Sequence, residues 1–160
     1  MDHPMARSGQ APSASELESH LGYWLRFVSN HVSNAFKAKV EAAGVSVSEW
    51  VVLRQLYAGQ LAAAGAIAEA IGMTKGAVSK VVARLEEKRL LQRSVLEDDR
   101  RQQGLALTAK GRELVPELAR LADENDAEFF GHLSKPARAE LLATLRELVH
   151  HHGLESVPVD

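Results

Sequence analysis

AGAIAEAIGMTKGAVSKVVARLEEK, residues 64–88, is the most informative segment of the sequence. It reads as two helices joined by a tight turn, with small Ala68 where the helices cross and Gly72 in the turn, where a positive φ is expected. Val78 and Val81 follow Gly72 by six and nine residues, on the inner side of the second helix. Because each position has a steric reason and all four agree, these spacings predict a helix-turn-helix.

The second helix of this pair has two different faces. Its predicted inner face is apolar, with Val78, Val81, Val82 and Leu85. Its predicted outer face combines cations, a hydroxyl and side chains too small to obstruct close approach: Lys75, Gly76, Ser79, Lys80, Ala83 and Arg84. Thr74 is placed to cap the helix, whose N-terminus then favours a phosphate. This pattern favours seating in the major groove of double-stranded DNA, and the alternative is an ordinary capped surface helix.

A charged hairpin follows directly. LLQRSVL, residues 90–96, and QGLALT, residues 103–108, alternate as strands do, and EDDRRQ lies between them. A hairpin after a helix-turn-helix predicts a winged helix, in which an arginine at the wing tip can enter the minor groove. A neighbouring aspartate can fix the direction of that arginine. A plain solvated turn is the alternative, but it does not explain why the hairpin follows this helix pair.

The remaining chain predicts a mainly α protein with a small β-hairpin wing. An apolar stripe predicts a helix over residues 15–43, Ser46 and Glu49 form a capping box for a helix over 47–58, and further helices are expected over 109–131 and 135–151. The apolar stripe over residues 15–43 cannot be buried by the helix that carries it, so another helix or another chain must cover it. We therefore expect a disordered tail over 1–14, dimerisation helices over 15–43 and 109–152, a DNA-binding lobe over 44–108 and a C-terminal tail over 153–160.

Composition narrows the functional class. The 160 residues contain no cysteine and no apolar run long enough for a membrane span, which suits a cytoplasmic protein without membrane partners. The formal net charge is only −2, but residues 73–112 hold ten basic and five acidic side chains, against nine basic and sixteen acidic elsewhere. A basic centre in an acidic frame indicates that one face meets a polyanion.

Three further stretches resemble the MarR family of winged-helix transcription regulators: GVSVSEWVVLRQL at 44–56, VVARLEEKRLL at 81–91 and DRRQQGLALTAKG at 99–111. The resemblance covers about residues 17–150. It implies a homodimeric repressor that reads a pseudo-palindromic operator and is released by a small, often aromatic or phenolic, molecule. It also implies recognition-helix roles for Thr74, Lys75, Gly76, Ser79, Lys80 and Arg84. The family's Asp-x-Arg wing falls on Asp99 and Arg101, while Asp98 and Arg100 fit with a shift of one residue.

The chain departs from the family pattern at three points. Alanines precede the first helix of the pair where the family has a Ser or Thr cap, so this helix is expected to fray. Arg89 replaces the family's glycine after LEEK and must take or avoid a left-handed conformation. The absence of cysteine excludes the family's redox-sensing branch.

Two weaker signals concern ligands. His150, His151 and His152 point in different directions on a helix, so we expect no metal site and no cofactor. Trp24 and His31 lie on one flank of the first helix and are candidates for binding an aromatic ligand, although interhelical packing is the favoured explanation.

Two other function classes stay open. They are a helical protein-interaction module and, less favoured, a metal-dependent hydrolase built on histidines and carboxylates. The sequence lacks a nucleophile elbow, a phosphate loop and an HExxH ligand pair, so we expect no enzyme.

Overall fold

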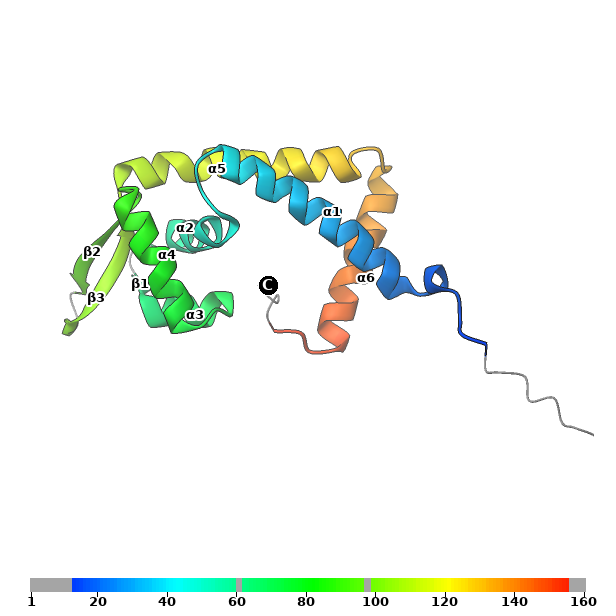
Figure 1. Cartoon of the computed structure of the whole chain (residues 1–160), viewed down its shortest axis with the longest axis horizontal. Coiled ribbons are helices and arrows are strands. Elements are labelled where there is room, and N and C mark those ends of the chain that lie inside the picture. The colour runs from blue at the N-terminus through cyan, green and yellow to red at the C-terminus, as the bar shows by residue number, and fades with distance from the viewer. Residues whose placement is uncertain (1–12, 60–61, 97–98, 156–160) are drawn as a thin grey trace, which may run out of the picture.

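A computed structural model of the chain describes residues 13–59, 62–96 and 99–155, and of residues 95, 96 and 99–103 it describes the backbone alone. The molecule is elongated (Figure 1). Helix α5 (Ala109–Phe130) runs along one edge beside α1 (Leu21–Ala42). A lobe of short helices and strands lies at one end, and α6 (Lys135–His151) lies at the other.

The lobe is the predicted winged helix. It contains α2 (Val47–Ala58), α3 (Ala64–Ile71) and α4 (Lys75–Glu87), with strands β1 (Ala62–Ala63), β2 (Leu91–Leu96) and β3 (Asp99–Leu107). The strands form an antiparallel sheet in the order β1-β3-β2. The predicted capping box is present: Glu49 N–H donates to Ser46 Oγ, and the Glu49 carboxylate accepts from Ser46 N–H.

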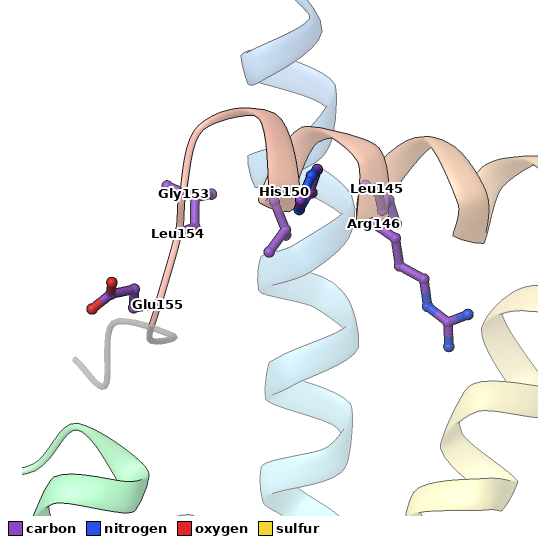
Figure 2. A pocket seen from close by; sticks show the side chains of 7 residues that line it. Leu145, Arg146, His150, Gly153, Leu154 and Glu155 are labelled. Carbon is purple, nitrogen blue, oxygen red and sulfur yellow. The ribbon is translucent and has the colours of Figure 1, made fainter.

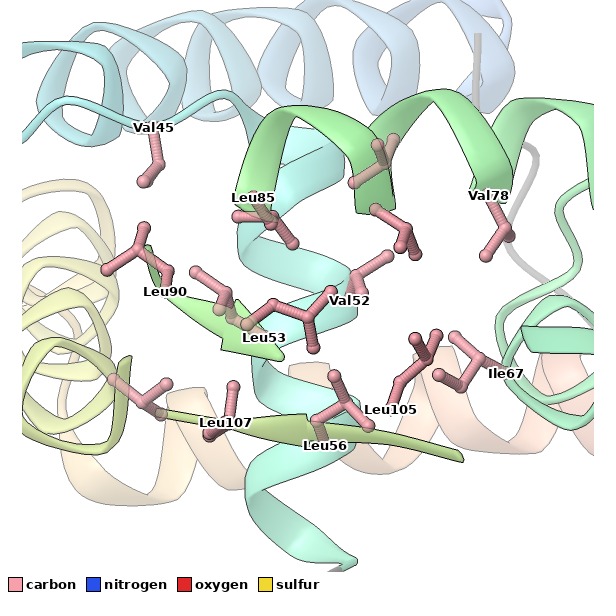
Figure 3. Close-up of a cluster of buried hydrophobic side chains, with 14 of the residues drawn as sticks. Val45, Val52, Leu53, Leu56, Ile67, Val78, Leu85, Leu90, Leu105 and Leu107 are labelled. Atoms are coloured by element: carbon pink, nitrogen blue, oxygen red, sulfur yellow. The ribbon is translucent and has the colours of Figure 1, made fainter. Parts of the chain in front are cut away.

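One apolar core holds the lobe together (Figure 3). Helix α2 contributes Val52, Leu53 and Leu56, which are at most 1% exposed. The inward residues of α4 and the strand residues Leu105 and Leu107 pack into the same cluster. Full burial of each valine or leucine contributes about 1.5–3 kcal/mol, so this cluster fixes the orientation of α4.

The start of the first helix was predicted wrongly. Instead of one helix from residue 15, a 3₁₀ turn occupies Leu17–Ser19, His20 is extended, and α1 begins at Leu21. The indole N–H of Trp24 donates to the Glu18 carbonyl at 2.9 Å, which fixes the preceding segment against the first turns of α1. The apolar period continues through this break and therefore conceals it.

The sheet differs from prediction in two ways. Strand β1 was not predicted, because two alanines carry no strand pattern; it pairs Ala62 with Leu105 and Ala63 with Gly104. Strand β3 begins at Asp99, so the backbone of residues 99–102 belongs to a strand and not to the predicted turn. A register shift lies between Val95 and Leu96.

Helices α1 and α5 are joined by a polar contact at their crossing. The Asn125 side chain is 3% exposed, and its Nδ2 donates to the Val32 carbonyl at 3.1 Å. Lys39 Nζ donates to Asn125 Oδ1 at 3.2 Å and to Glu128 Oε2 at 2.8 Å. A buried amide with satisfied partners permits only one register of these two helices.

The opposite end of the molecule leaves apolar side chains uncovered. No residue of α6 is buried, and five of its apolar side chains are 38–48% exposed: Leu141, Leu142, Leu145, Leu148 and Val149. The first half of α1 likewise exposes Leu21, Trp24, Leu25, Phe27 and Val28. In the parts of the chain that the structure describes, no helix has both the length and the apolar character of a membrane crossing.

The Leu-Thr-x-x-Gly motif joins the wing to α5. Thr108 accepts from Gly111 N–H at 3.1 Å as the cap of α5, and its hydroxyl donates to the Arg89 carbonyl at 2.7 Å. A Cβ at Gly111 would lie 2.2 Å from the Leu90 carbonyl oxygen. Glycine is therefore required at position 111 because helix α5 approaches the backbone before β2 this closely.

Replacing Gly111 with alanine should destabilise the protein. The added methyl group meets a backbone carbonyl that cannot rotate away, and such overpacking costs about 1–3 kcal/mol. The matched control is Gly22→Ala, because a Cβ at Gly22 meets nothing within 4 Å. Urea unfolding of both variants provides the measurement, and equal midpoints would contradict the assigned close approach.

Candidate nucleic-acid interface

The turn between α3 and α4 has the predicted geometry. Gly72 ends α3 in the left-handed region, with φ 70°, and Met73 N–H donates to the Ala68 carbonyl at 3.1 Å. Ala68 is 4% exposed and lies in the core cluster. The spacing argument from the sequence is therefore confirmed at these positions.

Helix α4 separates its residues into two faces as predicted. Val78, Val81, Val82 and Leu85 are at most 3% exposed. Lys75, Gly76, Ser79, Lys80, Ala83 and Arg84 are all exposed. We call this second set, together with Thr74, the α4 ridge.

The N-terminus of the α4 ridge is capped by a side chain. Thr74 Oγ1 accepts from Ala77 N–H at 3.1 Å. The cap satisfies one of the free N–H groups of the first turn, and the remaining N–H groups and the helix dipole favour an anion there.

The cations of the α4 ridge are free to meet a ligand. Within the described part of the chain, the side-chain nitrogens of Lys75, Lys80 and Arg84 make no hydrogen bond or ion pair. The stem of Lys75 lies over α3, with Cε 3.5 Å from where a Cβ on Gly65 would stand. Ser79 Oγ donates to the Lys75 carbonyl at 2.9 Å, which leaves its oxygen to act as an acceptor.

An ion pair fixes the wing to the last turn of α4. Arg93 Nε on β2 donates to Glu86 Oε1 on α4 at 2.7 Å. This pair was not predicted from the sequence, because neither residue is unusual and the spacing of seven spans a helix end and a turn. The pair is half-exposed, so it contributes orientation more than stability.

The structure does not test the predicted wing side chains. The backbones of Asp99, Arg100 and Arg101 form the start of β3, with Asp99 opposite Leu96, but their side chains lie outside the described set. Asp98 lies outside the described residues altogether. The choice between the two Asp-Arg alignments therefore stays a prediction.

An aromatic row lies on α1, away from the α4 ridge. The Trp24 ring is 6.3 Å from that of Phe27, which is 4.9 Å from the imidazole of His31. Trp24 and Phe27 are about half exposed, at 48% and 49%. The structure thus places Trp24 and His31 on one exposed flank, as the sequence predicted, without testing their role.

Two hollows lie elsewhere on the surface. One, of about 450 Å³, is lined at the end of α6 by Leu145, Arg146, Val149, His150, Gly153, Leu154 and Glu155 (Figure 2). The other, of about 460 Å³, lies between the end of α1 and the start of α5, beside Gly44, Lys88 and Lys110. Among the described residues, which include His150 to His152, no group of three or more His, Cys, Asp or Glu could hold a metal ion.

The lobe matches a known family model. Residues 43–102, which include the helix pair and the first part of the wing, match the model described as MarR family. This part of the chain is similar to the MarR family. Within the matched residues, Ala63 precedes α3 without a side-chain cap, and Arg89 adopts the left-handed conformation that the family's glycine favours, with φ 58°.

Solved structures of similar proteins match a larger share of this chain. MepR of Staphylococcus aureus, solved with DNA, is 26% identical with a TM-score of 0.71, over 82% of this chain and 98% of that one. BpsR of Bordetella bronchiseptica, described with 6-hydroxynicotinic acid as a regulator of its DNA binding, is 24% identical with a TM-score of 0.72, over 85% and 97%. MarR of Escherichia coli is 17% identical with a TM-score of 0.71, over 81% and 96%.

Replacing Thr74 with alanine should lower the free energy of unfolding by about 1 kcal/mol. The hydroxyl oxygen that accepts from Ala77 N–H is lost, whereas Thr74→Ser keeps it. Urea unfolding measures the difference between the two variants. A Thr74→Ala protein as stable as Thr74→Ser would show that the cap contributes nothing.

Proposed function

We propose that this protein is a transcription regulator that binds specific sequences of double-stranded DNA as a homodimer and acts as a repressor. The observation that carries the proposal is the α4 ridge, in which three cations lack side-chain partners within the described chain and the helix N-terminus is capped. The MepR–DNA complex, 26% identical over 82% of this chain, supports it.

The ridge has the chemistry that a DNA groove requires. Lysine and arginine neutralise phosphates, and an arginine or lysine can also read guanine edges. Ser79 presents an oxygen acceptor, which matches the exocyclic amino groups of adenine and cytosine. Gly76 and Ala83 carry little bulk, so the helix can approach the base edges closely. We assign the wing contacts to Asp99, Arg100 and Arg101, with an arginine entering the minor groove.

The exposed apolar residues on α1 and α6 support a dimer of this chain. Contiguous apolar surface of this kind marks an interaction site, and two-fold symmetry matches a pseudo-palindromic operator. We assign residues 15–43 and 109–152 to dimerisation and 44–108 to DNA binding. A DNA-binding function would place the protein in the cytoplasm, where it can reach the chromosome.

We further propose that a small aromatic or phenolic ligand releases the DNA. The regulation described for BpsR by 6-hydroxynicotinic acid is the precedent. In this chain, the exposed row with Trp24 and His31 offers rings for stacking and an imidazole that can pair with a carboxylate.

The proposed activity is binding and not catalysis, and a protein-interaction module is the rival. Selection from random-sequence duplexes with the full chain distinguishes them, followed by a mobility shift against the selected duplex and against DNA upstream of its own gene. Enrichment of a two-fold repeated motif supports the proposal. Failure to enrich any motif would overturn it and favour the rival.

Replacing Arg84 with alanine should weaken binding to all duplexes and reduce the steepness of its salt dependence. Loss of one phosphate contact lowers the slope of log K against log salt concentration by about 0.9. The control is Arg120→Ala on α5, which removes an exposed arginine paired with Glu124 away from α4. Titrations at several salt concentrations measure the slope, and an unchanged slope for the Arg84 variant would contradict the docking.

Replacing Leu145 with glutamate should dissociate the dimer. A charge in the apolar stripe of α6 would be buried without a partner, and each half-site is then bound alone, which lowers operator affinity by about tenfold or more. The control is Ala143→Glu, which adds the same charge to the same exposed helix outside the stripe. Analytical ultracentrifugation gives the mass, and a dimeric Leu145 variant would show that α6 is not the interface.

A further inference from the structure

The side chain of Lys88 attaches the C-terminal end of α4 to the turn after α1 and to α2. Its Nζ donates to the Gly44 carbonyl at 2.9 Å and lies 2.6 Å from Glu49 Oε2. Gly44 follows the end of α1, with φ 92°, and Glu49 lies in the first turn of α2. One side chain thus connects the recognition helix to the point where α1 turns into the lobe.

The carboxylate in this contact is buried. Glu49 is 2% exposed, and besides Lys88 it accepts only from Ser46 N–H, at 3.4 Å, among the described residues. A buried charge costs several kcal/mol unless it is paired. Lys88 is therefore held in one geometry by a group that cannot turn to solvent.

Helix α5 holds the same segment from the other side. Lys110 Nζ donates to the Lys88 carbonyl at 3.2 Å, while Thr108 donates through its hydroxyl to the Arg89 carbonyl and through its N–H to the Leu90 carbonyl. Residues 88–90 are thus hydrogen-bonded to the turn after α1, to α2 and to the start of α5. We call these three residues and their partners the Lys88 joint.

A small change of angle at the Lys88 joint produces a large displacement at the far end of the α4 ridge. The α4 ridge begins at Thr74, at the other end of a helix of 13 residues. At 1.5 Å per residue the helix is about 20 Å long, so a tilt of about 10° at the joint moves Thr74 by about 3 Å. That displacement approaches the rise of one base pair, about 3.4 Å.

We propose that Lys88 is a positioning residue: the Lys88 joint sets the angle between α4 and the α1–α5 pair, and thereby the spacing of half-sites that the dimer accepts. The inference rests on the proposed function. Asn125, which fixes the register of α1 and α5, makes those two helices a rigid frame for this angle. Lys88 is not placed on the DNA, since it lies beyond the ridge.

The test uses the full chain and the operator obtained by selection. Duplexes are made with one base pair inserted or removed between the half-sites, and affinity is measured for each spacing. The main variant is Lys88→Met with Glu49→Gln, which removes the tie without leaving a buried charge and keeps an acceptor for Ser46. The matched control is Lys37→Met with Glu41→Gln, an exposed pair on α1 at 3.8 Å.

The native chain should lose about tenfold or more in affinity when the spacing changes by one base pair. The main variant should bind the selected operator with about tenfold lower affinity than the native chain. Its affinities for the duplexes of different spacing should differ from one another by less than about threefold. Lys88→Arg, which keeps the charge and the donors, should restore the native preference for spacing. If Lys88 contributed only to stability, the main variant would lose the same factor of affinity, relative to the native chain, at every spacing. That result would overturn the inference.

A second variant provides an independent measurement if the main variant fails to fold. Lys110→Met removes an exposed donor to the Lys88 carbonyl and leaves Glu49 paired, so it should broaden the spacing preference in the same direction. A native spacing profile in every folded variant overturns the inference while leaving DNA binding intact. Failure of the native chain to bind any duplex overturns the proposed function instead, so the two failures are distinguishable.

Discussion

The burial of the apolar face of α4 determines which side chains of this helix face solvent. Val78, Val81, Val82 and Leu85 are held against α2 and the sheet, so the helix can present only its opposite side to a partner. Interiors pack at crystal-like density, and a rotation of α4 about its axis would expose valines and bury lysines. The cations of the α4 ridge therefore point outward because the opposite, apolar face of the helix is buried in the core.

A second constraint is the attachment of the lobe to the long helices. Gly111 allows α5 to approach the Leu90 carbonyl, Thr108 satisfies the carbonyl of Arg89, and Lys88 reaches Gly44 and Glu49. These contacts converge on three residues at the end of α4. The residues that contact DNA in the proposed function and those that hold the dimer together are thus connected through a short, well-hydrogen-bonded segment.

Most of the lobe could be predicted from the sequence because its rules are local. The left-handed glycine at 72, the capping box of Ser46 and Glu49, and the two faces of α4 each follow from spacings within one or two turns, and the structure has all three. Contacts between distant segments were not accessible in this way. The hydrogen bonds of Asn125 with Val32 and of Lys88 with Glu49 join residues that are 93 and 39 positions apart. No periodic pattern in the sequence predicts such contacts.

The misplaced start of α1 has a related cause. The apolar stripe that predicted the helix continues through the extended His20, so the pattern alone could not locate the break. The break is stabilised by the Trp24 indole N–H, which donates to the Glu18 carbonyl. The strand β1 was missed for the opposite reason, since two alanines have no pattern and are recruited by the edge of β3.

The two-residue strand β1 has a consequence for how the molecule opens. Helix α3 has no side-chain cap, and its start is held by backbone pairing of Ala62 and Ala63 with Leu105 and Gly104. The same strand, β3, pairs with β2 on its other side. Release of β3 would therefore free the beginning of α3 and the base of the hairpin together. The amide hydrogens of these segments then belong to a single cooperative unit, which exchanges with solvent water as one group.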